Sequence, residues 1–404
     1  MQYPVIKSLK RFYKEDYEAV LVKFYAMMKT LPLIDNTEIE GSSPPGVFVG
    51  RWNYPKVYIG PMIPPFHGDT TLLDTPEHWV GKSIKDIVNF RFSMVRGMYL
   101  SNVKTLEGNK IVEQTRELAL AGKSPDVEAE FKKKPHGLIL DENSQPFGPS
   151  APLQNFDVGN FRFDDKVEKA YYDTDLKAND AVMTLYQNDV FVSKIQKAFS
   201  VGAFGMKKRR KFVPTRWSIT AVDSIISQNL IERTKTYPTI NEFRIYETVQ
   251  LDNRWIVLMI PREWCYELIE AWYPKTIWNP EGREIRMFSD HEFFDGRKTY
   301  PDIGGCYMAG RIGVNELLNQ EKRQAGVVIL RETHPGYIMP VGVFNVRNAV
   351  REAVKSKPIK FSTLNDALTY ISTKLEISIN KWVESSAIIK DILQQRKIVD
   401  FIKI

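Results

Sequence analysis

Cysteine and histidine are scarce in this chain of 404 residues, which has two cysteines, Cys265 and Cys306, and five histidines. Two thiols exclude a disulfide scaffold, and they cannot by themselves supply the four ligands of a structural zinc site. No apolar run approaches the roughly 20 residues that a membrane-spanning helix requires. The opening segment, MQYPVIKSLKRFYKED, lacks an apolar core of signal-peptide length. We therefore expect a cytoplasmic, nucleoid-associated protein with no membrane partner and no structural zinc.

A phosphate-binding loop is also missing. The segment Ala121-Gly122-Lys123-Ser124 resembles the end of such a loop, but Glu117 occupies the position that requires the first glycine. Without that glycine the backbone cannot form the cradle of amide groups that holds phosphate. The segment therefore does not predict a nucleotide-hydrolysing enzyme of that class.

Apolar residues make up 43% of the chain and aromatic residues 12%, which is enough for a sizeable core. The formal net charge is +7. An excess of this size permits binding to nucleic acid without establishing it. The length allows two or three domains or one large one.

The periodicity of apolar residues predicts both helices and strands. The expected helices cover residues 8–30, 82–100, 109–122, 166–200 and 262–272, a segment after Gly305, a segment from Asn345, and residues 363–379 and 385–393. The expected strands cover residues 47–52, 56–60, 242–251, 254–261, 326–330 and 337–344, with a further strand after residue 211 and a loop over residues 132–160. This pattern predicts an α+β (mixed α/β) fold. We expect antiparallel-rich sheets with packed helices, two closely associated domains and a flexible C-terminal tail.

A short loop between the first two expected strands combines aromatic and cationic residues. It reads Arg51-Trp52-Asn53-Tyr54-Pro55-Lys56. Aromatic rings can stack on bases while cations contact phosphate. Arg51 and Lys56 are therefore candidate nucleic-acid ligands, and the alternative is a rigid surface hairpin.

The clearest charge run is Lys207-Lys208-Arg209-Arg210-Lys211. Five adjacent cations repel one another, and phosphate backbone is a natural partner because each neutralised phosphate releases a counterion. A solvated loop before a strand and a salt-bridge network with nearby acids are the alternatives.

Residues 288–302, FSDHEFFDGRKTYPD, carry the richest set of titratable groups. The candidates for an enzyme site are Asp290, His291, Glu292, Asp295 and Asp302, with Arg216 as a phosphate ligand. Carboxylates with one imidazole can hold a divalent cation for phosphodiester hydrolysis. Acidic loop clusters are also commonly solvated turns, so we assign no metal site. His334, which precedes Pro335, is expected to be a loop histidine.

The C-terminal segment Gln395-Arg396-Lys397-Ile398-Val399-Asp400-Phe401-Ile402 places three large apolar residues on one face of a helical turn. Such a turn fits a groove on another protein. It resembles the peptide with which replication and repair proteins dock on the sliding clamp (PCNA). In that resemblance Gln395 enters a polar pocket, and Ile398, Phe401 and Ile402 enter a hydrophobic one. The alternative is that the turn folds back on its own domain.

Four longer segments together resemble the archaeal Nre (NreA) family of DNA repair proteins. They are SSPPGVFVGRWNYPKVYIGPMIPP, VPTRWSITAVD, SDHEFFDGRK and RETHPGYIMPVGVFNVR. The resemblance runs from about residue 40 to the C-terminus, and the segments follow the family's order. It implies a role in the response to DNA damage and a C-terminal clamp-interacting peptide, which Gln395, Ile398, Phe401 and Ile402 match position by position.

The N-terminal region departs from that family, whose members commonly carry a zinc-finger cysteine cluster there. No cysteine occurs in this region, so zinc is not carried over, and Lys7, Lys10, Arg11 and Lys14 are the cations that could replace the finger's DNA contact. We expect Nre-like domains over residues 1–275 and 276–391 and a clamp-interacting tail over residues 392–404. The primary hypothesis is a repair factor recruited to the clamp. The alternatives are a metal-dependent phosphodiesterase or hydrolase acting on DNA or a nucleotide, and a non-catalytic scaffold.

Overall fold

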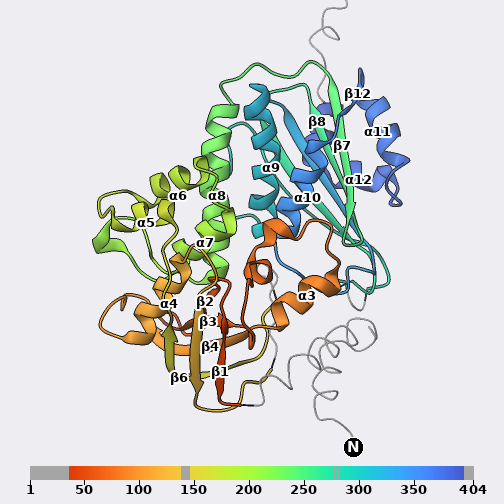
Figure 1. The fold of residues 1–404 in the computed structure, drawn as a ribbon. Coiled ribbons are helices and arrows are strands. Elements are labelled where there is room, and N and C mark those ends of the chain that lie inside the picture. The colour runs from red at the N-terminus through yellow and green to blue at the C-terminus, as the bar shows by residue number, and fades with distance from the viewer. Residues whose placement is uncertain (1–35, 138–145, 277, 280–281, 395–404) are drawn as a thin grey trace, which may run out of the picture. The chain divides into compact units, whose positions relative to one another are not determined.

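The computed structural model describes residues 36–137, 146–276, 278–279 and 282–394 (Figure 1). The chain forms two compact units, Met1–Ile226 with Met339–Phe344, and Ser227–Ile338 with Asn345–Ile404. The predicted helix over residues 8–30 and the predicted clamp peptide lie outside the described residues. Among those described, the expected α+β fold is confirmed, with a mixed six-stranded sheet in each unit.

The first unit is built on a sheet with the order β1-β5-β6-β4-β3-β2. Its neighbours are antiparallel except for β4 and β6, which run parallel. The strands are β1 (Glu38–Ser42), β2 (Val47–Val49), β3 (Lys56–Ile63), β4 (Val95–Asn102), β5 (Asp126–Phe131) and β6 (Ser150–Val158). Its helices are α3 (Ile84–Phe92), α4 (Lys110–Leu120), α5 (Asp165–Tyr172), α6 (Ala178–Gln187), α7 (Val192–Ser200) and the first part of α8 (Thr215–Thr234). Single 3-10 turns occur at η2 (Thr71–Asp74), η3 (Pro76–His78) and η4 (Lys207–Arg209).

Helix α4 packs on the sheet, and α7 packs on α4. Polar contacts then fix α8 against α7. The Ser218 hydroxyl donates to the Gln196 carbonyl at 2.5 Å, and the Gln196 amide donates to the Asp223 carboxylate at 3.0 Å. The start of α8 is therefore positioned by α7.

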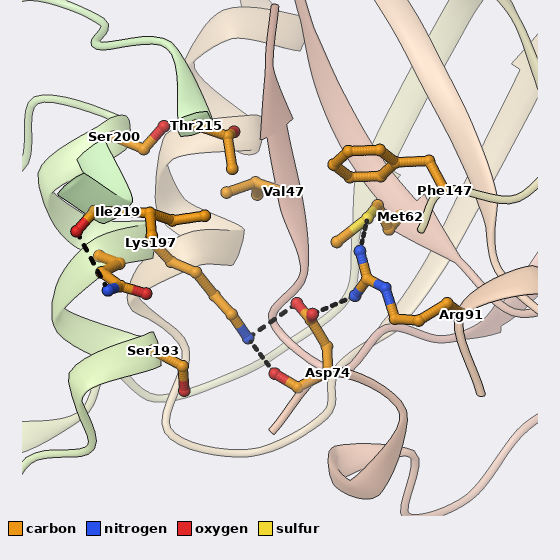
Figure 2. Close-up of a pocket in the computed structure, with 11 residues that line it drawn as sticks. Val47, Met62, Asp74, Arg91, Phe147, Ser193, Lys197, Ser200, Thr215 and Ile219 are labelled. Atoms are coloured by element: carbon orange, nitrogen blue, oxygen red, sulfur yellow. Dashed lines mark hydrogen bonds and ion pairs between the residues drawn. The ribbon is translucent and has the colours of Figure 1, made fainter. Parts of the chain in front are cut away.

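A buried carboxylate, Asp74, holds α7 to the sheet side of this unit. Figure 2 shows Arg91 of α3 and Lys197 of α7 reaching Asp74 from opposite sides. The Lys197 ammonium lies 2.8 Å from one carboxylate oxygen and donates to the Asp74 carbonyl at 2.8 Å. Only about 30 Å³ of open space remains between these groups and Val47 and Thr215. The charges are thus nearly sealed from solvent.

The second unit is built on a sheet with the order β10-β9-β11-β8-β7-β12, in which β9 and β11 run parallel. The strands are β7 (Phe243–Gln250), β8 (Asn253–Ile260), β9 (Cys265–Trp272), β10 (Arg286–Glu292), β11 (Gly326–Thr333) and β12 (Ile359–Phe361). The helices are α9 (Gly305–Glu321), α10 (Phe344–Lys355), α11 (Leu364–Ser372), α12 (Ile379–Ser385) and α13 (Ala387–Gln394).

Both faces of this sheet are covered. Helices α11, α12 and α13 pack on one face through an apolar cluster that includes Leu258, Leu330, Trp382 and Ile388. Helix α9 packs against β9, and Figure 1 shows α9 and α10 on the other face. The approach of α9 is close, because a Cβ atom at Gly310 would lie 2.5 Å from the Tyr266 hydroxyl.

A second buried carboxylate, Glu267 on β9, anchors α13. Its oxygens accept from the Ala387 amide at 2.8 Å, the Ile388 amide at 3.2 Å and the Ser386 hydroxyl at 2.5 Å. The unpaired amide groups at a helix N-terminus favour an anion there. The element that precedes the C-terminal segment is therefore fixed to the sheet.

Several predicted elements agree with the structure. The β2–β3 and β7–β8 hairpins are present, and the second turns at Leu251 and Asp252, both with positive φ. Helix α11 starts as its capping pattern predicts, since the Thr363 hydroxyl accepts from the Asp366 amide. Helices α4, α9, α10 and α13 also lie where apolar spacing placed them.

Other predictions of local structure were wrong. Residues 95–100 and 150–158 form strands β4 and β6 rather than helix and loop. Residues 262–272 contain strand β9 rather than a helix, because Glu267 and Glu270, which look like a polar helix face, are buried and paired. The segment after residue 211 starts helix α8 rather than a strand, and no strand forms over residues 337–344.

Removing the charge of Asp74 should destabilise the first unit. Asp74→Asn leaves the buried Arg91 and Lys197 without a counter-charge, which costs about 3–5 kcal/mol. The free energy of unfolding from urea titration measures the loss. Asp157→Asn is the control because its ion pair with Lys110 is largely exposed, and we expect a change below about 1 kcal/mol. Equal losses in the two variants would contradict the role of Asp74.

Candidate nucleic-acid interface

The predicted hairpin loop and the start of α8 come together in the first unit. The Val49 amide donates to the Thr215 hydroxyl at 2.9 Å, which ties β2 to the first residue of α8. The end of β4 is joined on both sides, since the Val103 amide donates to the Pro55 carbonyl and the Phe212 amide donates to the Val103 carbonyl. Residues 50–56 and 211–217 therefore form one surface.

Aromatic rings and cations occupy this surface. Trp52 is 75% exposed, Tyr54 41% and Trp217 45%. The Tyr54 and Trp217 ring centroids are 5.3 Å apart, and the Lys211 ammonium lies 3.4 Å from the Tyr54 hydroxyl. The Arg51 guanidinium lies 4.8 Å from the Trp52 ring centroid. We call these five residues the aromatic patch.

Exposed side chains continue from the loop onto β3. Lys56 and Tyr58 project from the strand while Val57 and Ile59 are buried, as strand alternation requires. The partner of Tyr58 across β4 is Leu100, which is also exposed. The candidate ligand Lys56 thus lies beside further exposed apolar and aromatic surface.

The basic run is not uniform. Lys207, Lys208, Arg209 and Lys211 are exposed. Arg210 instead donates to the carbonyl oxygens of Gly205, Tyr171 and Asp173, each at 2.7 Å. Two of these carbonyls lie at the C-terminal end of α5, where no intrahelical donor remains. The run therefore contains four surface cations and one structural arginine.

The acids of the predicted site do not share one environment, because some are buried on strand β10 and others are exposed. Asp290 and Glu292 are buried, and each carboxylate pairs with an arginine: Arg297 at 2.9 Å and Arg311 at 2.8 Å. Asp290 also accepts from the Ile303 amide. Both carboxylates are thus neutralised inside the second unit.

The other predicted site residues lie elsewhere. His291 alternates with the buried pair on β10 and packs edge-on against Phe293. Asp295 and Asp302 are exposed. Arg216 belongs to the first unit, whereas the acids belong to the second. Among the described residues of the second unit, the acids do not come together as one ligand set.

Within the described part of the chain, one group of three side chains could hold a metal ion. It consists of Glu332, His334 and Glu376, whose ligand atoms lie within 4.8 Å of one another. Glu332 already accepts from the amides of Glu376 and Ile377, and Glu376 pairs with Arg254. We assign no metal to this group.

Sequence reasoning found the loop and the basic run but missed Trp217 as a partner of Tyr54. The available signal was the segment Pro214-Thr215-Arg216-Trp217, since proline before a run of helix-forming residues is typical of a helix start. The predicted clamp-binding residues Gln395, Ile398, Phe401 and Ile402 lie outside the described residues. None of the described helices is long and apolar enough to cross a bilayer.

Two family models match the chain. The model for archaeal Nre, N-terminal, covers residues 13–279, and the model for archaeal Nre, C-terminal, covers residues 292–401. The chain belongs to the archaeal Nre family. The family models change over between residues 279 and 292, whereas the compact units divide after Ile226. The expected boundary at residue 275 stays a prediction.

Relatives of this Nre chain are named as DNA repair proteins. DNA repair protein NreB of Archaeoglobus fulgidus is 42% identical over 87% of this chain and 89% of its own length. DNA repair protein NreA of the same organism is 36% identical over 88% and 90%. DNA repair protein NreA of Haloferax volcanii is 33% identical over 86% and 85%. No solved structure matches the chain.

The difference between Arg210 and the exposed cations of the basic run can be tested by measuring the stability of variants. Arg210→Ala leaves three carbonyl oxygens without their charged donor, so we expect the free energy of unfolding to fall by about 2–3 kcal/mol. Lys208→Ala removes an exposed cation and should change it by less than about 0.5 kcal/mol. Urea titrations of both variants measure the difference. A Lys208→Ala variant as unstable as Arg210→Ala would rule out this division.

Proposed function

We propose that this chain is a DNA repair protein that binds single-stranded DNA through the aromatic patch and is recruited to the sliding clamp by its C-terminal peptide. The repair role is supported by the names of the relatives in Archaeoglobus and Haloferax. The observation that carries the DNA-binding part is the meeting of Tyr54, Trp217 and Lys211 from two distant segments.

The patch has the composition that unpaired bases require. Base stacking on an aromatic side chain contributes roughly 1–3 kcal/mol per base and tolerates any sequence. Trp52, Tyr54 and Trp217 are exposed, although burying aromatic rings is ordinarily favourable. Their exposure supports a ligand with flat apolar surfaces, and single-stranded DNA offers such surfaces where paired bases do not.

The exposed cations of the basic run complete this interface. Lys207, Lys208 and Arg209 precede Lys211, whose ammonium is already beside Tyr54. A phosphate backbone that crosses the patch meets these cations next. Each phosphate contact to a single strand gives a slope of roughly 0.7 in the dependence of log affinity on log salt. The basic run should therefore provide salt-sensitive affinity, and the rings should provide affinity that survives salt.

The clamp part of the proposal rests on the C-terminal pattern and on α13. Burying Ile398, Phe401 and Ile402 contributes roughly 5–8 kcal/mol gross, and ordering the segment costs roughly 2–5. The net affinity is on the order of micromolar. Helix α13, held by Glu267, ends at Gln394, directly before Gln395. A weak tether of this kind recruits a protein without performing a reaction.

DNA binding should depend on the aromatic patch. We expect Trp52→Ala and Trp217→Ala each to weaken binding of a fluorescent single-stranded oligonucleotide by about tenfold, the loss of roughly one stacked base. Fluorescence anisotropy measures the dissociation constant. Tyr172→Ala is the control because this residue is 66% exposed on the same unit but lies outside the patch. Unchanged affinity in both tryptophan variants would remove the patch from the proposal.

Clamp binding should depend on the C-terminal peptide. A chain that ends at Leu393, and the variant Phe401→Ala, should bind the cognate clamp at least about tenfold more weakly than the full chain. Isothermal titration calorimetry measures the affinity. Lys403→Ala is the control because it lies beyond the apolar pattern. Equal binding by the full and shortened chains would exclude this mode of recruitment.

A further inference from the structure

The first unit contains a second cavity that the proposed function does not use. Its volume is about 370 Å³, within the usual range for small-molecule sites. Its walls come from the loop before β2, the turn after α4, the start of α5 and the start of α7. The polar groups that matter here are Lys123, Lys166, Ser193, Lys194 and Lys197.

Lys194 has an unusual position on this cavity wall. Its ammonium nitrogen donates to the Ala119 carbonyl at 3.0 Å and to the Ala121 carbonyl at 2.5 Å. These carbonyls lie at the C-terminal end of α4, whose last carbonyl groups lack intrahelical donors. The nitrogen is therefore fixed in place by two acceptors.

The protonation of Lys194 is also unusual. Burial and the neighbouring Lys197 ammonium lower the pKa of Lys194 to about 7, although the Asp164 carboxylate opposes the shift. Near neutral pH a large fraction of the amine is then uncharged. A neutral amine has two N–H bonds and one lone pair. Because the two carbonyls accept both N–H bonds, the lone pair occupies the remaining tetrahedral position.

We propose that Lys194 is an amine nucleophile that forms an imine with an aldehyde bound in this cavity, and that the aldehyde is the base-free deoxyribose of damaged DNA. A fixed amine next to a second cation is a recurrent arrangement for lysines that form Schiff bases. The choice of DNA as the source of the aldehyde rests on the proposed function; the amine chemistry stands on the cavity alone.

The reaction balances without an added oxidant or reductant. The nitrogen lone pair attacks the aldehyde carbon, and a proton passes from the nitrogen to the carbonyl oxygen to give a neutral carbinolamine. The hydroxyl group then takes up a proton from solvent and leaves as water, while the nitrogen lone pair forms the C=N bond of an iminium that keeps one N–H. The nitrogen enters as the neutral amine, so the rate follows the uncharged fraction of Lys194.

Two lysines on the exposed side of the cavity can contact a phosphate-bearing aldehyde. Lys123 is exposed there, and Lys166, whose ammonium donates to the Asn188 carbonyl, is exposed as well, so both can contact the phosphates that flank a base-free sugar. Asp164 is occupied as the cap of α5, where it accepts from the Lys166 and Val167 amides. Asp165 and Asp189 also line the exposed side, so their carboxylates act on the site together with the charge of Lys197.

The test is reductive trapping. The full-length protein is incubated with a single-stranded oligonucleotide that contains one base-free site, and sodium cyanoborohydride reduces the iminium to a stable secondary amine. We expect a covalent protein–DNA product that peptide mass spectrometry places on Lys194. Trapping should rise between about pH 6 and 8 and then level off, because the pKa lies near 7. Reaction at an ordinary surface lysine would keep rising above pH 9, since its pKa is about 10.4.

Lys194→Arg is the decisive variant because arginine retains N–H donors for the two carbonyls but forms no imine. It should reduce trapping at least tenfold, whereas Lys177→Arg, a matched change at an exposed lysine of the same unit outside this cavity, should not. Thermal unfolding shows whether both variants are folded. If Lys194→Arg does not fold, the position of the adduct in the unaltered protein decides the question instead.

Two further experiments identify the source of the aldehyde and distinguish this inference from the proposed function. Trapping of glyceraldehyde 3-phosphate on Lys194 without trapping of the base-free DNA would overturn the assignment to DNA. An adduct spread over other lysines would overturn the role of Lys194 altogether. Binding of intact oligonucleotide is measured on the same samples. Absence of trapping in a protein that still binds oligonucleotide through the aromatic patch would refute only this inference. Absence of oligonucleotide binding would refute the proposed function.

Discussion

The carboxylate of Asp74 is the constraint on which the first unit depends. It holds a guanidinium from α3 and an ammonium from α7 in a place that water barely reaches. Buried ions of this kind contribute little net stability when paired and cost several kcal/mol when unpaired. The position of α7 is therefore specified more strictly than apolar packing alone would achieve. Helix α8 takes its position from α7, and the aromatic patch includes the start of α8.

The ion pair between Asp74 and Lys197 also affects the second cavity. Lys197 is fixed by Asp74, and its positive charge then lies beside the amine of Lys194. One carboxylate thus positions the helix beneath the proposed DNA surface and also sets the charge next to the proposed nucleophile.

The sequence predicted those features that depend on local chemistry. The hairpin loop and the capping of α11 follow from turn residues and side-chain acceptors, all within a few positions. Strand β9 was missed because its identity depends on distant partners. Glu267 is satisfied by residues 386–388 and Glu270 by Arg331. Without those partners, two glutamates among apolar residues are typical of an amphipathic helix.

The candidate site also contains features that residue type predicts and features that depend on distant contacts. Arg51, Lys56 and the basic run could be proposed as candidates from residue type, but residue type cannot separate Arg210 from its neighbours. That distinction depends on carbonyl oxygens from residues 171, 173 and 205. The acids of residues 290–302 show the same limit. Their residue types allow a metal site, and only the fold shows that Asp290 and Glu292 are buried and paired with arginines of the second unit.

The anchoring of α13 has a mechanical consequence for any clamp that holds this chain. Helix α13 is described to Gln394, and the proposed clamp motif begins at the next position of the sequence. Flexible linkers let a tethered protein move through a radius that grows with the square root of their length. Under the proposed recruitment, a clamp that binds Gln395 would hold a residue next to a helix that is fixed to the sheet of the second unit, and that unit would remain close to the ring.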